Sequence, residues 1–470
     1  MPVSVFPTGT TIYDPLRSWN GYTLFQATMF RGTEVGAVLI DMNGNVVNQW
    51  KGLDGIPNKM LPGGYVMGSS GTRNPKYGSQ DQLDVVQVDW EGNVVWKFDR
   101  YELVKDPRRK PKWMARQHHD FQREGNPVGY YVPGMEPLVD GGNTLILCHK
   151  NVHNPEISGN PLLDDVVIEV TWEGQVVWEW MCSKHFEEMG FSEEAKNTIS
   201  RHPYSRNVAG SPGDWMHLNS MSALGPNNWF DSGDERFHPD NIIWSSRNAN
   251  IIAIIDKKMG NIVWKLGPDY SGTEQLKKMG WIIGQHHAHM IPRGLPGEGN
   301  ILVFDNGGQA GYGSPNPGSP TGMGNGLRDY SRVLEFDPTT LEVVWSNTPV
   351  EPGRRDGPQA GFRIYSSNIS SAQRLPNGNT MVTEGAGGRI FEVTREYEIV
   401  WEYVSPYFSR ERHMNAVYRA YRLPYSWVPQ IDRPREIGLK RVDNSRFRVP
   451  GSPATRRHKV TRIQRRRLHS

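Results

Sequence analysis

Six tryptophans close six similar stretches of this chain, and this repeat constrains the fold more than any other feature. They are Trp50, Trp96, Trp178, Trp264, Trp345 and Trp401. Each follows an alternating apolar run, a turn and a second alternating run, as in VVQVDWEGNVVWKF and VVIEVTWEGQVVWEW. Two alternating runs around a tight, glycine-containing turn predict a β-hairpin. Six such hairpins, at irregular intervals of 46 to 86 residues, indicate a repeat array.

A second recurring element precedes most of these hairpins, and it consists of a short strand, a glycine-containing turn and another strand. The segments are NKMLPGGYVMGSS, PLVDGGNTLILCH, HPDNIIWSSRN, GEGNILVFDNG and RLPNGNTMVTEGAGG. Pairing each with the hairpin that follows gives four strands per unit, and six such units predict a six-bladed β-propeller. The predicted fold class is therefore all-β: a propeller over residues 1–430 with short helical insertions, followed by a basic tail over residues 431–470.

The insertions between blades differ in character. FEEMGFSEEAKNTISR, beginning at Phe186, predicts a surface helix, and GTEQLKKMGW predicts a shorter one before Trp281. Residues 307–326 are rich in glycine, proline and serine and predict a long mobile loop, which we interpret as a lid. In residues 409–424 the spacing of Met, Val and Tyr favours a helix packed under the propeller over a dimerisation segment.

The charge distribution separates a body from a tail. Residues 433–470 hold 13 Lys or Arg against two acidic residues, so this segment carries a net charge of +11 and the rest of the chain −8. Such a tail is typical of a solvated, poorly ordered segment, and the alternative is docking to an anionic surface. Because the body is acidic, no nucleic-acid partner is expected.

Hydropathy and cysteine content restrict the cellular compartments that the sequence suggests. The mean hydropathy is −0.61 and no stretch approaches 18 uninterrupted apolar residues, so no membrane span is expected. The start of the sequence lacks a signal-peptide pattern, which predicts a cytoplasmic protein, or a periplasmic one if the sequence is a trimmed mature form. Cys148 and Cys182 cannot form a disulfide framework, and we expect two free buried thiols.

The histidines gather on the strands that should line the central channel. The first strand of a blade faces that channel, and RQHHDFQ, DWMHLNSM and GQHHAHMIP open the third, fourth and fifth blades, whereas SSNISSAQRLP opens the sixth without a histidine. The polar candidates on these strands are His118, His119, Asp120, His217, Asn219, His286, His287, His289 and Arg374. One buried histidine is usually a satisfied core residue. Imidazoles on three blades at equivalent positions instead indicate a functional site.

Strand alternation and neighbouring charges refine this prediction. Alternation places His118 and Asp120 on the face opposite His119, so one imidazole of each doublet should point into the channel. Asp120 or Asp214 could fix a histidine tautomer. Arg247 follows the second strand of the fourth blade and should reach the same channel mouth, where its five donors suit an oxyanion.

In these motifs (HHDF, WMHLNS, SSRN, GQHHA, FDNG and AQRLPNGNT) the chain resembles the arylsulfotransferase family over about residues 10–425. These PAPS-independent aryl-sulfate sulfotransferases are six-bladed propellers. The resemblance implies transfer of a sulfuryl group from an aryl sulfate to a phenol through a covalent sulfo-histidine, without a cofactor. It matches His286 to the nucleophile, His217 and Arg247 to the groups that bind the sulfuryl oxygens, and His118 or His119 to the remaining site histidine.

Under this interpretation the remaining channel residues would bind the aromatic substrate. They are His287, His289, Asn219, Asp120 and Arg374. No GxSxG elbow, P-loop or dinucleotide fingerprint is present, so the sequence does not favour a serine hydrolase or a nucleotide-binding enzyme.

Two alternatives remain open from the residues themselves. Clustered imidazoles could hold Cu, Fe, Ni or Zn, which would make the chain a metal-dependent enzyme acting on an aromatic or other small substrate in the same channel. The metal ligands would then be His119, His217, His287 and His289. The second alternative is a non-catalytic binding propeller. The sequence leaves the oligomeric state open, with a dimer as one option.

Overall fold

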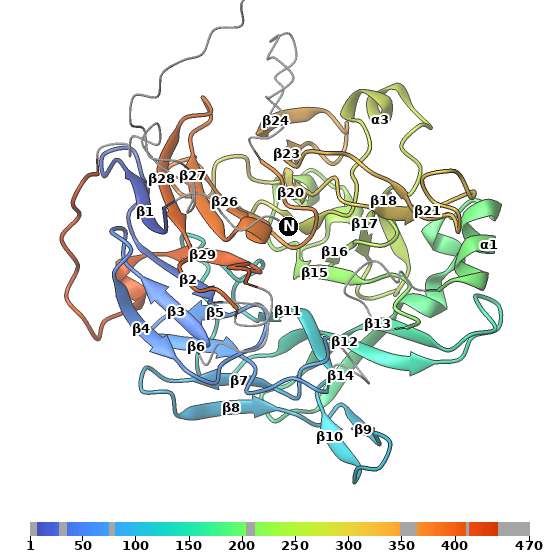
Figure 1. Ribbon diagram of the computed structural model, residues 1–470, viewed down its shortest axis with the longest axis horizontal. Coiled ribbons are helices and arrows are strands. Elements are labelled where there is room, and N and C mark those ends of the chain that lie inside the picture. The colour runs from blue at the N-terminus through green and yellow to red at the C-terminus, as the bar shows by residue number, and fades with distance from the viewer. Residues whose placement is uncertain are drawn as a thin grey trace, which may run out of the picture.

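The strands form antiparallel sheets arranged radially around a central axis (Figure 1). This computed structural model describes residues 7–27, 35–74, 80–203, 212–347, 364–409 and 413–439. Within these residues six blades are present, five of four strands and one of five, together with two separate two-stranded hairpins. The predicted six-bladed β-propeller is therefore confirmed.

The first three blades are described from the channel outward. Blade 1 contains β29 (Ala420–Leu423), β2 (Tyr22–Gln26), β3 (Ala37–Ile40) and β4 (Val46–Trp50). Blade 2 contains β5 (Lys59–Leu61), β6 (Tyr65–Gly68), β7 (Val85–Val88) and β8 (Val94–Phe98). Blade 3 contains β11 (Gln117–Arg123), β12 (Thr144–Val152), β13 (Leu162–Val170) and β14 (Val176–Met181).

The other three blades follow the same order. Blade 4 contains β15 (Leu218–Ala223), β16 (Ile242–Ser246), β17 (Ile251–Ile255) and β18 (Ile262–Leu266). Blade 5 contains β19 (His286–Met290), β20 (Ile301–Asp305), β23 (Arg332–Phe336) and β24 (Val343–Asn347). Blade 6 contains β25 (Ser371–Arg374), β26 (Thr380–Glu384), β27 (Arg389–Val393), β28 (Ile399–Val404) and, at its outer edge, β1 (Gly9–Tyr13).

The six repeat tryptophans join each blade to the next. Each indole N–H donates to a backbone carbonyl in the turn of the following blade's outer hairpin. The pairs are Trp50 to Asp89 (3.1 Å), Trp96 to Trp172 (2.7 Å), Trp178 to Lys257 (3.0 Å), Trp264 to Pro338 (2.8 Å), Trp345 to Arg395 (3.1 Å) and Trp401 to Met42 (2.8 Å). The last pair links blade 6 to blade 1, so the repeat found in the sequence is an uninterrupted ring of contacts between blades.

Both ends of the described chain take part in closing the ring. β29 pairs with β2, with Tyr22 opposite Leu423, and β1 pairs with β28, with Gly9 opposite Val404. The helix predicted within residues 409–424 is therefore wrong. Blade 1 lacks an inner strand of its own, and the buried side chains of Ala420–Leu423 fill that place against β2.

Insertions extend from the blades. The helix predicted from Phe186 is α1 (Glu193–Arg201), capped by the Ser192 side chain and preceded by short 3₁₀ turns, and the second predicted helix is α3 (Glu274–Met279). α2 (Asn228–Asp231) was not predicted. The three α-helices that the structure describes run for nine residues at most, too short to cross a bilayer.

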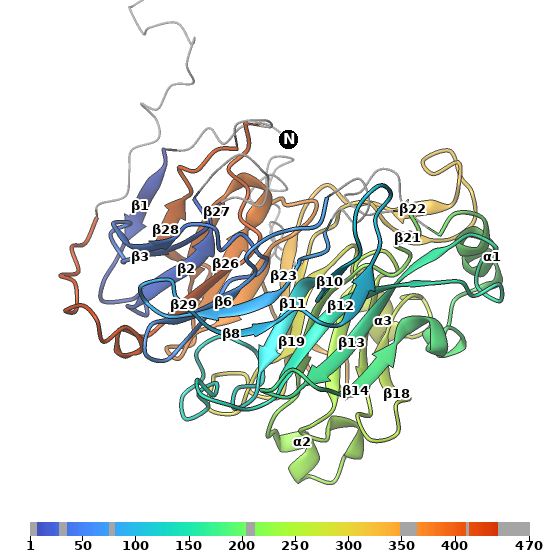
Figure 2. The same cartoon turned by 90° about the horizontal axis from the view of Figure 1, so that it is seen from below.

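Residues 307–326 contain a hairpin in place of the predicted mobile loop. It consists of β21 (Ala310–Tyr312) and β22 (Met323–Gly326), which lie beside α1 (Figure 2). The Thr198 hydroxyl of α1 donates to the Gly313 carbonyl (2.9 Å), and the Tyr312 hydroxyl donates to the Trp215 carbonyl (2.6 Å). These contacts hold the insertion against blade 4.

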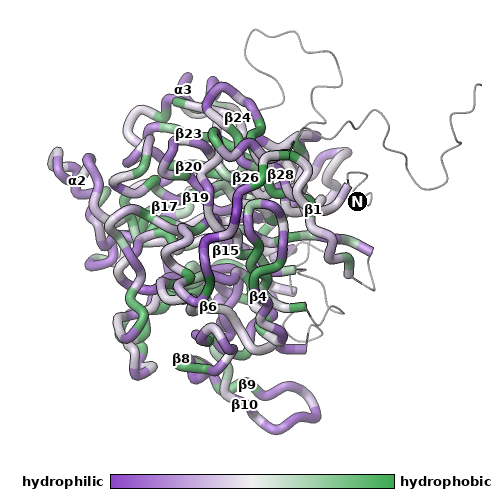
Figure 3. Tube along the Cα trace, turned by 90° about the vertical axis from the view of Figure 1, so that its left-hand side faces the viewer, coloured by the Kyte–Doolittle hydropathy of each residue, from purple (hydrophilic) through white to green (hydrophobic). Residues whose placement is uncertain are grey.

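Two further features concern the edges of the molecule. β9 (Glu102–Val104) and β10 (Lys112–Met114) form a hairpin that projects from the body with a hydrophilic turn (Figure 3). Residues 431–439 follow the η6 turn (Tyr425–Trp427) and return to β1, where the Leu439 amide donates to the Tyr13 carbonyl (2.9 Å). Of the basic tail predicted for residues 431–470, the part from residue 440 onward lies outside the described residues. Cys148 and Cys182 are free and buried, as expected.

Candidate active site

The functional side chains meet at one end of the channel, where inner strands begin and second strands end. His118 and His119 lie near the start of β11, His217 directly precedes β15, and His286 begins β19. Arg247 and Asn306 directly follow β16 and β20. All six side chains are at least nine-tenths buried. The repeat therefore brings residues that are far apart in the sequence to one end of the axis.

Irregular backbone conformations set the directions in which the imidazole side chains point. His119, His217 and His287 have φ angles of 56°, 53° and 56°, in the left-handed region that residues other than glycine rarely adopt. The ladders of β11 and β19 shift register at the same places. Simple alternation therefore does not hold. His118 and His119 do not point to opposite faces, and their Nδ1 atoms lie 2.8 Å apart.

Asp214 orients His217. The Asp214 carboxylate accepts a hydrogen bond from His217 Nδ1 at 2.6 Å, so the Nε2 atom of the neutral ring carries a lone pair. The His217 ring contacts His119 edge to face, with 4.7 Å between ring centroids. The sequence suggested that Asp120 or Asp214 fixes a histidine tautomer, and Asp214 is the one that makes this contact. The imidazolium of His217, once formed, would be stabilised by this carboxylate.

Arg247 is a buried cation without a carboxylate partner. Among the described residues it makes no ion pair; its guanidinium donates to Asn248 Oδ1 at 3.3 Å, and Nε has no hydrogen-bond partner. Its amide donates to the His217 carbonyl (3.1 Å), which places it beside that histidine. Burial lowers the pKa of Arg247 to about 10, so it remains charged at neutral pH. A buried guanidinium with unused donors is suited to binding an anion.

His286 is held as one tautomer. Its Nδ1 lies 2.7 Å from Asn306 Oδ1 and 3.1 Å from the Gly284 carbonyl, so Nδ1 carries the proton and donates to these acceptors. Nε2 then carries a lone pair and accepts a 3.2 Å hydrogen bond from the Ile369 amide. Burial, followed by the charge of Arg247, lowers the pKa of His286 well below its usual value. The ring is therefore neutral and can act as a nucleophile at Nε2.

The other clustered imidazoles are neutral for the same reason. Burial is the largest cause that lowers the pKa values of His118, His119 and His287 well below the usual range, and neighbouring histidines or Arg419 add to it. Burial also lowers the pKa of His289 to about 4. Each charge disfavours the next, which is the expected consequence of gathering imidazoles in a water-poor site.

Several predicted substrate-binding residues instead connect the blades. Asp120 forms ion pairs with Lys59 (2.7 Å) and Arg419 (2.8 Å). Arg374 pairs with Glu335 (2.5 Å) on the neighbouring blade. These side chains satisfy one another in the interior, and their role in binding the substrate stays a prediction.

Asn219 and the two downstream histidines of β19 also bond to backbone. The Asn219 amide donates to the Gln285 carbonyl (2.7 Å), and His287 Nδ1 donates to the Ala372 carbonyl (2.9 Å). His289 uses both ring nitrogens: Nδ1 donates to the His287 carbonyl (2.9 Å), and Nε2 lies 3.0 Å from the Tyr130 hydroxyl. A metal held by His119, His217, His287 and His289 remains a prediction, and it would require His289 to give up one of these bonds.

The sequence interpretation missed a group directly behind His118. Across the described residues, one set of His, Cys, Asp or Glu ligand atoms converges within 4.8 Å, and it consists of His118, His149 and Asp165. His149 lies near the end of β12, as Arg247 and Asn306 lie at the ends of β16 and β20. This positional equivalence between second strands was the signal that could have found it.

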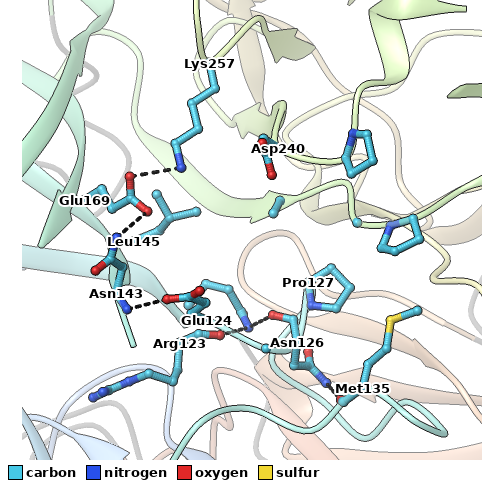
Figure 4. A pocket seen from close by; sticks show the side chains of 16 residues that line it. Arg123, Glu124, Asn126, Pro127, Met135, Asn143, Leu145, Glu169, Asp240 and Lys257 are labelled. Atoms are coloured by element: carbon cyan, nitrogen blue, oxygen red, sulfur yellow. Dashed lines mark hydrogen bonds and ion pairs between the residues drawn. The ribbon is translucent and has the colours of Figure 1, made fainter. Parts of the chain in front are cut away.

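A cavity of about 460 Å³ lies at the opposite end of β11, between blades 3 and 4. Its lining includes Lys257 paired with Glu169 (2.9 Å) and Asn143, whose backbone N–H donates to Glu124 (2.7 Å) (Figure 4). None of the predicted site residues lines it. The candidate chemistry is therefore at the histidine end of the channel.

The fold and the site together define an all-β propeller with a buried cation and neutral imidazoles at one end of its channel. The sequence matches the family described as Arylsulfotransferase (ASST) over residues 137–419, more than half of its length, and the chain belongs to this family. A search of curated proteins found no match.

Solved structures match this chain at low identity. A protein of unknown function from Bacteroides caccae is 10% identical, with a TM-score of 0.42, over 86% of this chain and 99% of that one. Virginiamycin B lyase from Staphylococcus aureus is 12% identical, with a TM-score of 0.35, over 87% of each chain.

Proposed function

We propose that this protein transfers a sulfuryl group from an aryl sulfate to a phenolic acceptor, with His286 as the group that carries the sulfuryl moiety between them. The observation that carries this proposal is Arg247: a buried guanidinium with unused donors and no carboxylate partner among the described residues. It lies beside His217, and its charge acts on His286. An oxyanion such as a sulfate ester would supply the missing negative charge.

His286 has the tautomer that a nucleophile needs. Asn306 holds the proton on Nδ1, so the Nε2 lone pair can attack sulfur. A nitrogen–sulfur bond forms, the bond between sulfur and the aryl oxygen breaks, and its electron pair leaves with the aryl oxygen. The Ile369 amide, which now donates to Nε2, must release this lone pair before attack. Ile369 and Ser370 have φ angles of 56° and 93°, so this segment is strained where it must move.

The pair of His217 and Asp214 balances the protons. In the first half-reaction a protonated His217 gives its proton to the leaving phenolate, and in the second half-reaction the neutral ring removes the proton of the acceptor phenol. The acceptor oxygen then attacks the sulfur and releases neutral His286. Arg247 binds the sulfuryl oxygens in both steps, in a site where buried donors act strongly on the charge of the transition state.

The test uses p-nitrophenyl sulfate as donor and phenol as acceptor. Release of nitrophenol that depends on phenol, together with an increase in protein mass by one SO₃ group when phenol is omitted, would support the proposal. His286→Ala should abolish both signals, whereas His153→Ala, at an exposed position on β13's preceding loop, should leave them unchanged. The proposal is wrong if the wild-type protein releases no nitrophenol, or if His286→Ala retains the wild-type rate.

A further inference from the structure

Four buried polar atoms without hydrogen-bond partners converge behind His118. They are Nε2 of His118, Nε2 of His149 and both carboxylate oxygens of Asp165. Asp165 Oδ1 lies 3.1 Å from His118 Nε2 and 3.8 Å from His149 Nε2. Their side chains are at most 2% exposed, so water outside the protein does not compensate these atoms. An unpartnered buried polar group is costly, so four such atoms in one place mark a candidate site for a proton or a bound ion.

The arrangement rests on the central strands of one blade. His149 and Asp165 are directly opposite each other in the ladder of β12 and β13, and His118 lies on the adjacent strand β11. Side chains opposite each other on one face of an antiparallel pair lie close by construction. Sites built on strands are held more rigidly than sites built on loops.

Asp165 forms no ion pair with a lysine or arginine among the described residues. The buried cations Arg73 and Arg116 both pair with Asp81, the partner of His149, at 2.9 Å. Among the described residues no Lys or Arg forms an ion pair with Asp165, and Asp164 and Asp214 are buried beside it. A carboxylate in such a place is stable only with a proton or a bound cation.

His149 already makes, through its other ring nitrogen, the carboxylate hydrogen bond that is common for metal-ligating histidines. His149 Nδ1 donates to Asp81 Oδ1 at 2.7 Å, so its Nε2 lone pair faces Asp165. A metal-ligating histidine commonly donates its other ring N–H to a carboxylate, which fixes the tautomer and raises the basicity of the ligand. The two arginines that hold Asp81 keep this carboxylate ionised, since they lower its pKa together with His149.

We propose that His118, His149 and Asp165 bind one divalent transition-metal ion of the zinc type, through two imidazole nitrogens and a carboxylate. Two nitrogens and one oxygen suit Zn²⁺ and Co²⁺ and leave a fourth position for water. The rings of His118 and His149 stack with 3.6 Å between centroids and 12° between planes, so their Nε2 lone pairs lie in two nearly parallel planes. Binding must therefore tilt one ring so that the two Nε2 atoms point to a common centre.

Such an ion would also act on the candidate active site through one hydrogen bond. With Nε2 of His118 bound to metal, its Nδ1 must carry a proton and donate to His119 Nδ1, which lies 2.8 Å away. His119 then carries its own proton on Nε2, the nitrogen not engaged with His118. Only this last step depends on the proposed function, because metal binding itself is independent of it.

The test measures Co²⁺ binding to tag-free protein that has been dialysed against a chelator. Wild-type protein should bind about one equivalent of Co²⁺ with the intense visible bands of a low-coordinate site, and Zn²⁺ should displace it. Asp165→Asn and His149→Gln should abolish these bands. Asp81→Asn, which replaces the carboxylate behind His149 and removes one of the partners of Arg73 and Arg116, should weaken binding about 10- to 100-fold. The exposed His153→Gln variant is the matched control and should bind as wild type does.

Two outcomes would overturn the proposal: no Co²⁺ binding by the wild-type protein, or binding that Asp165→Asn and His149→Gln leave intact. The first result does not depend on whether any variant folds, and near-ultraviolet circular dichroism checks the variants. His286→Ala should retain Co²⁺ binding. Failure of the metal site and failure of the sulfuryl-transfer proposal therefore give different results.

Discussion

Arg247 is a buried cation whose side-chain partner differs from the partners of Arg374 and Arg422. A guanidinium removed from water loses its hydration, and in most interiors a carboxylate replaces it. Arg374 follows this rule with Glu335, and Arg422 with Glu392, whereas Arg247 has Asn248 as its side-chain partner. Under the proposed function, the counter-ion of Arg247 would be the sulfate group of the substrate.

The first prediction concerns this guanidinium. Arg247→Lys keeps the charge but removes the planar fork of donors, so kcat/KM for p-nitrophenyl sulfate should fall about 100-fold. Arg293→Lys, at an exposed arginine paired with Asp231, serves as the control. Its kcat/KM should stay within twofold of wild type, because an exposed ion pair contributes little. Steady-state kinetics of nitrophenol release decide the matter. Equal values for the two variants would remove Arg247 from the reaction.

The second prediction concerns pH. Burial and the charge of Arg247 hold the pKa of His286 below its ordinary value, so the ring is neutral and nucleophilic at pH values where a free histidine is protonated. The pKa of His286, followed by NMR of labelled histidine, should therefore lie below 6.5 and should rise in Arg247→Gln. Loss of activity from protonation of this group should begin only below its depressed pKa. A normal pKa that Arg247→Gln does not change would contradict the assignment.

At this scale the sequence indicated which residue types would meet but not their partners. His217, His286 and Arg247 could be found because each follows from the blade repeat and its motifs. The bond from His286 to Asn306 joins different strands, and that from Ile369 joins different blades, so no local pattern shows either. The left-handed backbone at His119 and His287 breaks strand alternation, which is why facing directions could not be predicted.

At the scale of elements, β29 is the strand with the greatest effect on the fold. Its Arg422 is fully buried and donates to Thr23 Oγ1 and the Trp19 carbonyl, both at 2.8 Å, and it pairs with Glu392 at 3.4 Å. These bonds connect blade 1 to blade 6. The spacing of Met, Val and Tyr in residues 409–424 predicted a helix, and only the need to complete blade 1 explains the observed strand.

The third prediction tests this connection. Arg422→Met leaves the buried Glu392 without its cation and should lower the free energy of unfolding by about 3–5 kcal/mol. The double variant Arg422→Met/Glu392→Gln should recover part of this loss, because the uncompensated charge is gone. Arg17→Met breaks an exposed pair with Glu398 and should cost less than about 1 kcal/mol. Urea denaturation measures all three, and equal losses for Arg17→Met and Arg422→Met would refute the argument.

At the scale of the whole molecule, the ring is joined both at its rim and at its axis. The six tryptophan bonds join neighbouring blades at the rim. Near the axis, Asp120 of blade 3 accepts from Lys59 of blade 2, from Arg419 next to blade 1, and from the Met221 amide of blade 4. Asp120 is thus one side chain that contacts three other blades.

The fourth prediction follows from this position. Asp120→Asn leaves two buried cations, Lys59 and Arg419, without their shared carboxylate, and should reduce the free energy of unfolding by about 3–5 kcal/mol. Asp240→Asn, at an exposed aspartate, should change it by less than about 0.5 kcal/mol. Thermal and urea unfolding of both variants provide the comparison. A near-neutral Asp120→Asn would mean that Asp120 does not stabilise the joined blades.

The fold class could be predicted from the sequence because its repeat is local: each hairpin carries its own turn and its own tryptophan. The way in which the ring closes could not, because it joins residues about 400 positions apart, such as Tyr22 and Leu423. The same distinction applies to the metal-binding proposal, since Asp81, His149 and Asp165 come together only after blades 2 and 3 have packed.

The closure by β29 has a consequence for how the protein is made. A ribosome synthesises β2, β3 and β4 long before β29, so blade 1 waits as a three-stranded sheet with the inner edge of β2 unpaired while the other blades emerge. Such an edge is a template for wrong pairing with other chains. The ring is therefore completed only after β29 has been synthesised, and a ribosome stalled before residue 420 leaves an open, aggregation-prone propeller.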